Sequence, residues 1–269
     1  QASQVGRKSF INWSTREKLN RSDRSSGRKV LFFVDQYANW HNPILGRALV
    51  EVLRHHKISV YVPTTQTPSY MAMISAGEIQ RARKLISANI KVLADGVRQG
   101  YDIVALEPTA VLCFQQEYRS IIDNEDTALI AQNSYEASAY LWAMHEKNEL
   151  ELDLKPVNFS VIYHEPCHSR FLYPHRPALT ILELIPGLQV TLADAGCSGM
   201  AGTFGLQRKN FRTSIRIGWN LISRVRESTT QIGATECIAC KLQMDQASSR
   251  PTVHPVALLA YSYGRMPQL

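Results

Sequence analysis

The segment Phe159-Ser-Val-Ile-Tyr-His-Glu-Pro-Cys167 joins a short apolar run to a cysteine, and this pattern decides the fold of the chain. The β-branched and aromatic residues at 159–163 predict a buried strand, which ends before the Pro-Cys step. Further along, apolar spacing predicts helices over 177–184 and about 207–226, and strands over 188–192 and just before Thr235. Strands that alternate with helices indicate a parallel sheet with right-handed crossovers.

The first half of the sequence shows the same order of elements. Strands are predicted over 30–34, 58–62 and 103–106, helices over 43–56 and 78–98, and a connecting helical region over 124–147. We therefore expect an α/β fold of two pseudo-symmetric repeats, residues 29–150 and 151–269, each a small parallel sheet flanked by helices.

The spacing of the residues that follow the predicted strands supports an internal duplication. In the second half, Cys197 lies 30 residues after Cys167, and Cys237 lies 40 residues further on. In the first half, the matching positions are separated by 32 and 39 residues, and with the position matched to Cys240 they are Gln36, Pro68, Glu107 and Ala110. None of them is a cysteine, so only the second repeat is predicted to carry a metal.

Four of the five cysteines lie between residues 167 and 240, and the fifth, Cys113, is predicted to be a core residue. An odd, small number of cysteines is typical of a reducing compartment, where cysteines are buried, catalytic or metal-bound. Because Cys167, Cys197 and the Cys237/Cys240 pair all follow predicted parallel strands, their thiols can converge at one sheet edge. Four thiolates suit an iron–sulfur cluster or tetrahedral zinc, and free redox-active thiols are a third reading.

Histidines flank two of the cysteine motifs. His164 and His168 surround Cys167, where each is a metal ligand, a hydrogen-bond donor to sulfur or a polar residue at the loop edge. His254, just before a proline, is expected to cap the last helix. The sequence contains no Ser-His-Asp, paired-carboxylate, Walker or GxGxxG pattern in a convincing setting, so we expect no catalytic residue in this chain.

Positive charge is concentrated at the start of the chain. Residues 1–30 carry a net charge of +6 out of +7 for the whole sequence. The polar run 20–27 lacks apolar periodicity, so residues 1–28 are predicted to be a basic, flexible linker. Outside it we find no basic stripe interleaved with aromatic residues, which argues against nucleic acid as a partner.

The second-half motifs resemble those of the cysteine-rich CCG domain family. The matching segments are Tyr-His-Glu-Pro-Cys167-His, Ala-Gly-Cys197-Ser-Gly-Met-Ala-Gly-Thr-Phe-Gly, Thr-Glu-Cys237-Ile-Ala-Cys240-Lys-Leu-Gln-Met and Val-His254-Pro255. The family includes one of the subunits of heterodisulfide reductase and the iron–sulfur subunits of glycolate oxidase and anaerobic glycerol-3-phosphate dehydrogenase. The chain looks most similar to the C-terminal part of fused FAD-binding and Fe–S-binding oxidoreductases, over about residues 30–264.

The resemblance implies a ligand set and a cofactor. Carried over residue by residue, the ligands are Cys167, Cys197, Cys237 and Cys240, which would hold a 4Fe-4S cluster or, as in some relatives, zinc. Ser198 stands where the family has its second adjacent cysteine, which argues against a noncubane cluster. We expect Ser198 to donate a hydrogen bond to a neighbouring sulfur or to cap the next turn.

The resemblance also implies partners and a place in the cell. The chain would be the electron-transfer module of a larger oxidoreductase that acts on a 2-hydroxy acid or glycerol phosphate, with FAD only on a partner domain or subunit. It would pass electrons to a quinone, a membrane acceptor or a protein, in the cytoplasm or at the inner face of the membrane. A structural zinc-binding interaction domain of the same kind of protein is the alternative.

Overall fold

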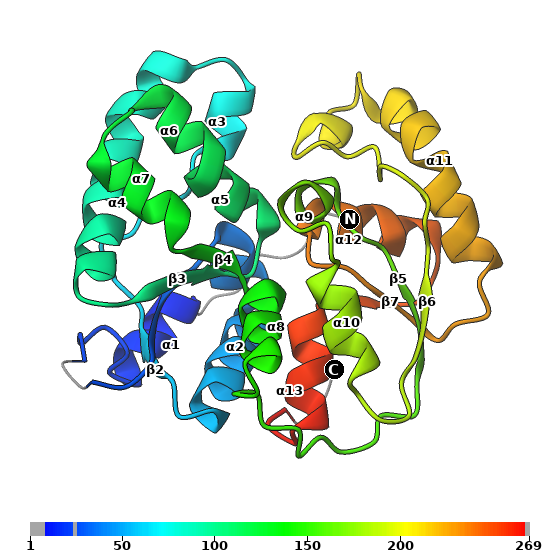
Figure 1. Cartoon of the computed structure of the whole chain (residues 1–269). Helices are drawn as coiled ribbons and strands as arrows, with labels where there is room; N and C mark the ends of the chain where they lie inside the picture. The colour runs from blue at the N-terminus through cyan, green and yellow to red at the C-terminus, as the bar shows by residue number, and fades with distance from the viewer. Residues whose placement is uncertain (1–8, 24–25, 267–269) are drawn as a thin grey trace. The chain divides into compact units, whose positions relative to one another are not determined.

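The computed structural model describes residues 9–23 and 26–266 of the chain, which divides into two compact units, Gln1–Tyr140 and Leu141–Leu269 (Figure 1). Helix α8 (Ala137–Glu146) contains the point of division, about ten residues before the boundary predicted at residue 150. Each unit contains one four-stranded sheet in which all strands are parallel. The predicted α/β fold of two repeats is confirmed.

The first unit is built on a sheet of strand order β2-β1-β3-β4. Its elements before α8 are α1 (Phe10–Arg16), β1 (Lys29–Phe33), the π-helix η1 (Tyr37–His41), α2 (Pro43–His55), β2 (Ser59–Tyr61), α3 (Met71–Ser75), α4 (Ile79–Arg98), β3 (Asp102–Ala105), α5 (Pro108–Leu112), the π-helix η2 (Cys113–Glu117), α6 (Tyr118–Ile121), α7 (Glu125–Gln132) and β4 (Ser134–Glu136). Every residue of β1 after Lys29 is buried, because helices cover the sheet.

The second unit repeats this topology with the order β6-β5-β7-β8. Its elements after α8 are β5 (Ser160–Tyr163), α9 (Cys167–Leu172), α10 (Pro177–Glu183), β6 (Gln189–Leu192), the 3-10 helix η3 (Phe204–Leu206), α11 (Phe211–Glu227), β7 (Ile232–Ala234), α12 (Ile238–Ala247), β8 (Thr252–Val253) and α13 (Pro255–Ser262). The chain runs from β5 outward to β6 and then returns to β7 on the other side. In such sheets ligands bind at the carboxyl ends of the strands where the order reverses.

Helices of the second unit pack on the sheet through their apolar stripes. Leu221 and Val225 of α11 and Met244 of α12 form one buried cluster with Ile162 of β5. Helix α11 lies beside α12, and α10 lies beside α13 (Figure 1). Leu221 and Val225 of α11 therefore belong to the core of the second unit.

The predicted flexible linker over residues 1–28 is wrong for residues 9–23. Residues Phe10–Arg16 form α1, capped by the side chain of Ser9, which accepts a hydrogen bond from the amide of Asn12. Phe10 is fully buried and packs edge-on against Phe32 of β1, with ring centroids 5.3 Å apart. The buried ring of Phe10 and the Ser9 cap stabilise this helix although the segment is mostly polar. The helix is only seven residues long, so apolar periodicity could not predict it. Residues 1–8 and 24–25 lie outside the described residues.

Within residues 9–23 and 26–266, no helix combines the length and the apolar content that crossing a bilayer requires.

Candidate metal centre

The predicted ligand cysteines all lie at the carboxyl edge of the second sheet. Cys167 is the first residue of α9, four residues after β5 ends. Cys197 lies in the loop after β6, and Cys237 is the N-cap of α12, three residues after β7 ends. Because β5 pairs with both β6 and β7, these three loops are neighbours. Parallel pairing thus brings together cysteines that are far apart in the sequence.

The four thiols are arranged as two pairs. Cys167 and Cys197 form a hydrogen bond with each other, and so do Cys237 and Cys240. Negative charge on Cys237 also raises the pKa of Cys167, so the two pairs influence each other's charge. Cys237 and Cys240 are buried, Cys197 is half-buried and Cys167 is exposed. Among the described residues, no three His, Cys, Asp or Glu side chains form a group that could hold a metal ion as they stand.

Backbone amides favour negative charge on two of the sulfurs. The amide of Gly199 donates to Cys197 Sγ over 3.3 Å, and the amides of Ala239 and Cys240 donate to Cys237 at the start of α12. The hydrogen bond from Cys167, assisted by the Gly199 amide, lowers the pKa of Cys197 to about 5, while the same pairing and burial raise the pKa of Cys167. The pairing therefore favours negative charge on Cys197 rather than on Cys167.

Ser198 lies next to the buried pair. Its side chain is almost fully buried, and its Oγ is 3.3 Å from Cys240 Sγ. The Cys240 thiol donates this hydrogen bond to the Ser198 hydroxyl, so the predicted contact with a neighbouring sulfur is present but its direction is opposite to the prediction. When Cys240 is a thiolate, the hydroxyl is the donor of that hydrogen bond.

The histidines divide into one cap and two neighbours of Cys167. His254 is the N-cap of α13, and its Nδ1 accepts from the amide of Val256 over 3.1 Å, as predicted. His164 is buried, and its Nε2 has no hydrogen-bond partner in the described part of the chain. Burial, assisted by the charge of Arg170, lowers the pKa of His164 to about 4, so the ring is neutral. Burial also lowers the pKa of His168.

Two glutamates that the sequence reasoning missed hold the cysteine loops in place. Glu236, just before Cys237, accepts from Tyr163 Oη over 3.0 Å and from Ser169 Oγ over 3.1 Å. It therefore ties the start of α12 to the end of β5 and to α9. Both glutamates stand one or two residues before a predicted ligand cysteine, and this recurrence was the available signal.

The second glutamate, Glu165, holds the approach to α9. Its carboxylate is nearly inaccessible and pairs with Arg170 over 3.4 Å and with Arg176 over 3.2 Å. A buried carboxylate requires such partners, because an unpaired charge away from water is costly. The turn that carries Cys167 is thereby fixed.

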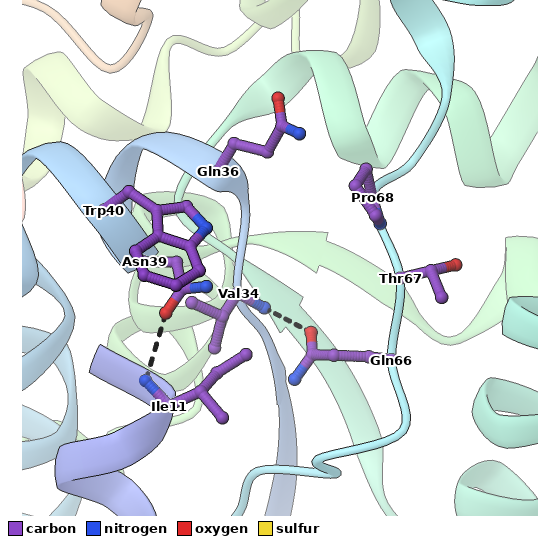
Figure 2. Close-up of a pocket in the computed structure, with 8 residues that line it drawn as sticks. All are labelled: Ile11, Val34, Gln36, Asn39, Trp40, Gln66, Thr67 and Pro68. Carbon is purple, nitrogen blue, oxygen red and sulfur yellow. Dashed lines mark hydrogen bonds between the residues drawn. The ribbon is translucent and has the colours of Figure 1, made fainter. Parts of the chain in front are cut away.

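The matching edge of the first sheet has a different character. The loops after β1 and β2 enclose a cavity of about 90 Å³ (Figure 2). Its lining contains no cysteine, histidine or carboxylate and consists of Ile11, Val34, Gln36, Asn39, Trp40, Gln66, Thr67 and Pro68. The amide of Val34 donates to Gln66 Oε1 over 2.7 Å, and Gln66 Nε2 donates to the carbonyl of Pro63 over 2.9 Å. Neutral amides line this cavity, and Cys113 lies buried elsewhere in the unit, with its Sγ donating to the carbonyl of Ser69.

Comparison with known proteins identifies the second unit. Residues 161–245 match the family described as CCG, cysteine-rich domain. One of the subunits of anaerobic glycerol-3-phosphate dehydrogenase from Escherichia coli (strain K12) is 30% identical over 86% of this chain and 58% of that protein. One of the subunits of fumarate reductase (CoM/CoB) from Methanothermobacter marburgensis is 25% identical over 88% of this chain and 45% of that protein. D-2-hydroxyglutarate dehydrogenase from E. coli (strain K12) is 23% identical over 90% of this chain and 23% of that protein. The chain therefore spans less than two thirds of the length of these relatives.

Proposed function

We propose, from the match of residues 161–245 to the cysteine-rich CCG family, that the chain is an iron–sulfur electron-transfer module. It serves a larger FAD-linked oxidoreductase of the 2-hydroxy acid or glycerol-phosphate type. The names of its relatives, which include subunits of a glycerol-3-phosphate dehydrogenase and of a fumarate reductase and a 2-hydroxyglutarate dehydrogenase, support this class. The flavin resides on a partner domain or subunit, and electrons leave towards a quinone or a protein.

The observation that supports the proposal is that all four cysteines follow the carboxyl ends of three neighbouring parallel strands. Cys167, Cys197, Cys237 and Cys240 would hold the cluster through their thiolates. The donor set fits, because the Gly199 amide and the first amides of α12 already point at two of the sulfurs. A bound iron–sulfur cluster supplies one-electron transfer at a potential set by hydrogen bonds to sulfur and by burial.

The residues of this chain have three tasks in that role. The thiolates bind, the amides and the Ser198 hydroxyl stabilise negative charge on sulfur, and Glu165 and Glu236 hold the loops that carry the cysteines. Cys237 and Cys240 are buried, whereas Cys167 is exposed, so one side of the centre is within reach of a partner. None of these residues acts on a substrate.

The second candidate function is a structural zinc site in an interaction domain of the same kind of protein. Because residue 198 is a serine and not a fifth cysteine, the second unit offers four thiols, which is the number of ligands that tetrahedral zinc takes. This count favours zinc. Both metals accept the same donors, so the metal content distinguishes the two functions.

The test is anaerobic purification followed by iron, zinc and acid-labile sulfide analysis. We expect iron with sulfide, and a visible absorption band that dithionite bleaches. One zinc without sulfide would reject the electron-transfer role and support the structural one. Cys240→Ser should lose most of the metal, whereas Cys113→Ser, in the first unit, should keep all of it; equal loss from both would contradict the ligand assignment.

A further inference from the structure

A strongly basic segment with aromatic residues among its cations follows Cys197, contrary to the prediction that no basic stripe interleaved with aromatic residues lies outside residues 1–28. Residues 195–226 contain no acidic residue and six basic ones, which are Arg208, Lys209, Arg212, Arg216, Arg224 and Arg226. The prediction was based on the net charge of the chain after residue 30, which is only +1. Acidic residues outside 195–226 offset the six cations of this segment, so the sum did not reveal them. The charge is local, and its position therefore matters.

The same segment exposes large apolar side chains. Five of them lie between residues 204 and 219, and they are Phe204, Leu206, Phe211, Ile217 and Trp219. Trp219 is 54% exposed and Leu206 is 58% exposed. Clustered exposure of large apolar groups marks interaction sites. Phe171 on α9, four residues after Cys167, is 65% exposed as well.

Close backbone contacts fix this surface to the cysteine loop. A Cβ atom on Gly199 would lie 2.1 Å from the carbonyl oxygen of Ser214 in α11. A Cβ atom on Gly218 would lie 2.1 Å from the carbonyl oxygen of Ser198. The N-terminal half of α11 therefore rests directly on the turn that follows Cys197. Whatever binds the exposed side of this half-helix is held beside the candidate centre.

Four cations in and just before the first half of α11 are available to a partner. Arg208, Lys209, Arg212 and Arg216 are all exposed. None of the four forms an ion pair within residues 9–23 and 26–266. Unpaired cations next to exposed aromatic rings are the composition of a protein interface with an acidic counterpart.

We propose that residues 204–219, which we name the docking surface, bind an acidic face of the flavoprotein that exchanges electrons with the centre. This proposal rests on the proposed function and names its partner surface. Guanidinium groups match carboxylates through paired hydrogen bonds, and three of the four cations are arginines. Redox encounters use small interfaces, for which a patch of this length suffices.

The structure favours a protein over a lipid surface as the occupant. A helix that lies in a membrane inserts its apolar face. Leu221 and Val225 of α11 are already buried in the core of the second unit. On the exposed side, Arg212 and Arg216 lie among the apolar groups and leave no continuous apolar stripe.

The test uses the full chain and bacterial flavodoxin, a small acidic flavoprotein, as the probe. Binding is measured by sedimentation velocity and reduction by stopped-flow absorbance, at about 20 mM and about 500 mM salt. The matched variants are Arg212→Gln/Arg216→Gln and Arg224→Gln/Arg226→Gln. Both remove two charges from exposed positions of α11, but the second pair lies about 16 Å further along the helix.

We expect the Arg212/Arg216 variant to lower both association and reduction rate about tenfold at low salt, with the difference lost at high salt. The Arg224/Arg226 variant should change either by less than about twofold. Trp219→Ala should weaken binding about tenfold at both salt concentrations, because it removes apolar contact area.

Three outcomes would overturn the proposal. These are equal effects of the two arginine pairs, absence of salt dependence, and failure of flavodoxin to bind at low salt. A membrane role would show a different pattern with vesicles of one third anionic lipid. The Arg212/Arg216 variant alone would lose vesicle binding, and its binding to flavodoxin would be unchanged. If dithionite does not bleach the visible absorption of the protein, the iron–sulfur function is rejected. Sedimentation velocity would still show whether the docking surface binds flavodoxin.

Discussion

Replacing Gly199 by alanine tests whether the contact between the cysteine loop and α11 positions the metal ligands. Gly199 has φ of +81°, and a Cβ atom there would meet the Ser214 carbonyl oxygen at 2.1 Å and the Gly218 nitrogen at 2.8 Å. Ordinary contacts of a Cβ atom begin near 3.4 Å, so the loop or the helix must shift by more than about 1 Å, as overpacking of a dense interior demands. Neither neighbour is a flexible side chain that could turn away.

The magnitude has two parts. The left-handed backbone costs an alanine about 1 kcal/mol, and displacement of packed backbone costs about 1–3 kcal/mol more. Gly202 provides the matched control, because it has φ of +62° in the same loop but nothing within 4 Å of its Cβ position. Gly202→Ala should therefore cost about 1 kcal/mol and Gly199→Ala about 2–4 kcal/mol.

The assay combines urea unfolding of the metal-free chain with metal analysis of the purified protein. Gly199→Ala should also lose metal, because the shift displaces Cys197, Ser198 and the amide that donates to Cys197 Sγ. Gly202→Ala should keep its metal. Equal loss of stability in the two variants, or full metal content in Gly199→Ala, would refute the argument that the α11 contact sets the position of Cys197.

Three further predictions concern other parts of the chain. Phe10→Ala should lower the free energy of unfolding by about 3–4 kcal/mol in urea titrations, whereas the exposed neighbour Asn12→Ala should change it by less than about 0.5 kcal/mol; similar values would show that α1 does not contribute to the core. Burial raises the pKa of Glu136 to about 7, so the folded chain holds a proton that the unfolded chain releases, and stability should fall by up to about 3 kcal/mol as pH rises from 4.5 through 7. Glu136→Gln should flatten that dependence, and an unchanged slope would contradict the assignment. Ser198→Ala should bind metal at the wild-type ratio, with only a modest change of potential, because the hydroxyl contacts sulfur without replacing it; an emptied site would make Ser198 a ligand.

The repeated topology could be predicted from the sequence because most strands are apolar runs that helices separate. The fourth strand of each sheet was missed for a physical reason. Residues Ser134–Glu136 form β4 with only three residues, and Thr252–Val253 form β8 with two. Neither contains an apolar run, and each exists because a neighbouring parallel strand supplies its hydrogen bonds.

The candidate site was predictable in its residues but not in its supports. Cysteines are rare enough to be found from spacing alone, and their position after strands is what brings them together. The roles of Glu165 and Glu236 depend on partners that are distant in sequence, such as Arg176 and Tyr163. The contact of α11 with the cysteine loop depends on Gly199 and Gly218 approaching backbone from another element. Composition and periodicity carry no trace of such contacts.

The pairing of the thiols divides the candidate site into two halves of different character. Each pair comes from its own part of the sheet edge: Cys237 and Cys240 are fixed by the first turn of α12, whereas Cys167 and Cys197 come from two separate loops. The first pair is buried and held by helix amides, so its geometry depends little on metal. The second pair lies nearer the surface, and its shared proton must leave before both sulfurs can bind. A metal that joins the two pairs therefore adds a constraint between α9, the Cys197 loop and α12, and through Gly199 it also constrains the half of α11 that forms the docking surface.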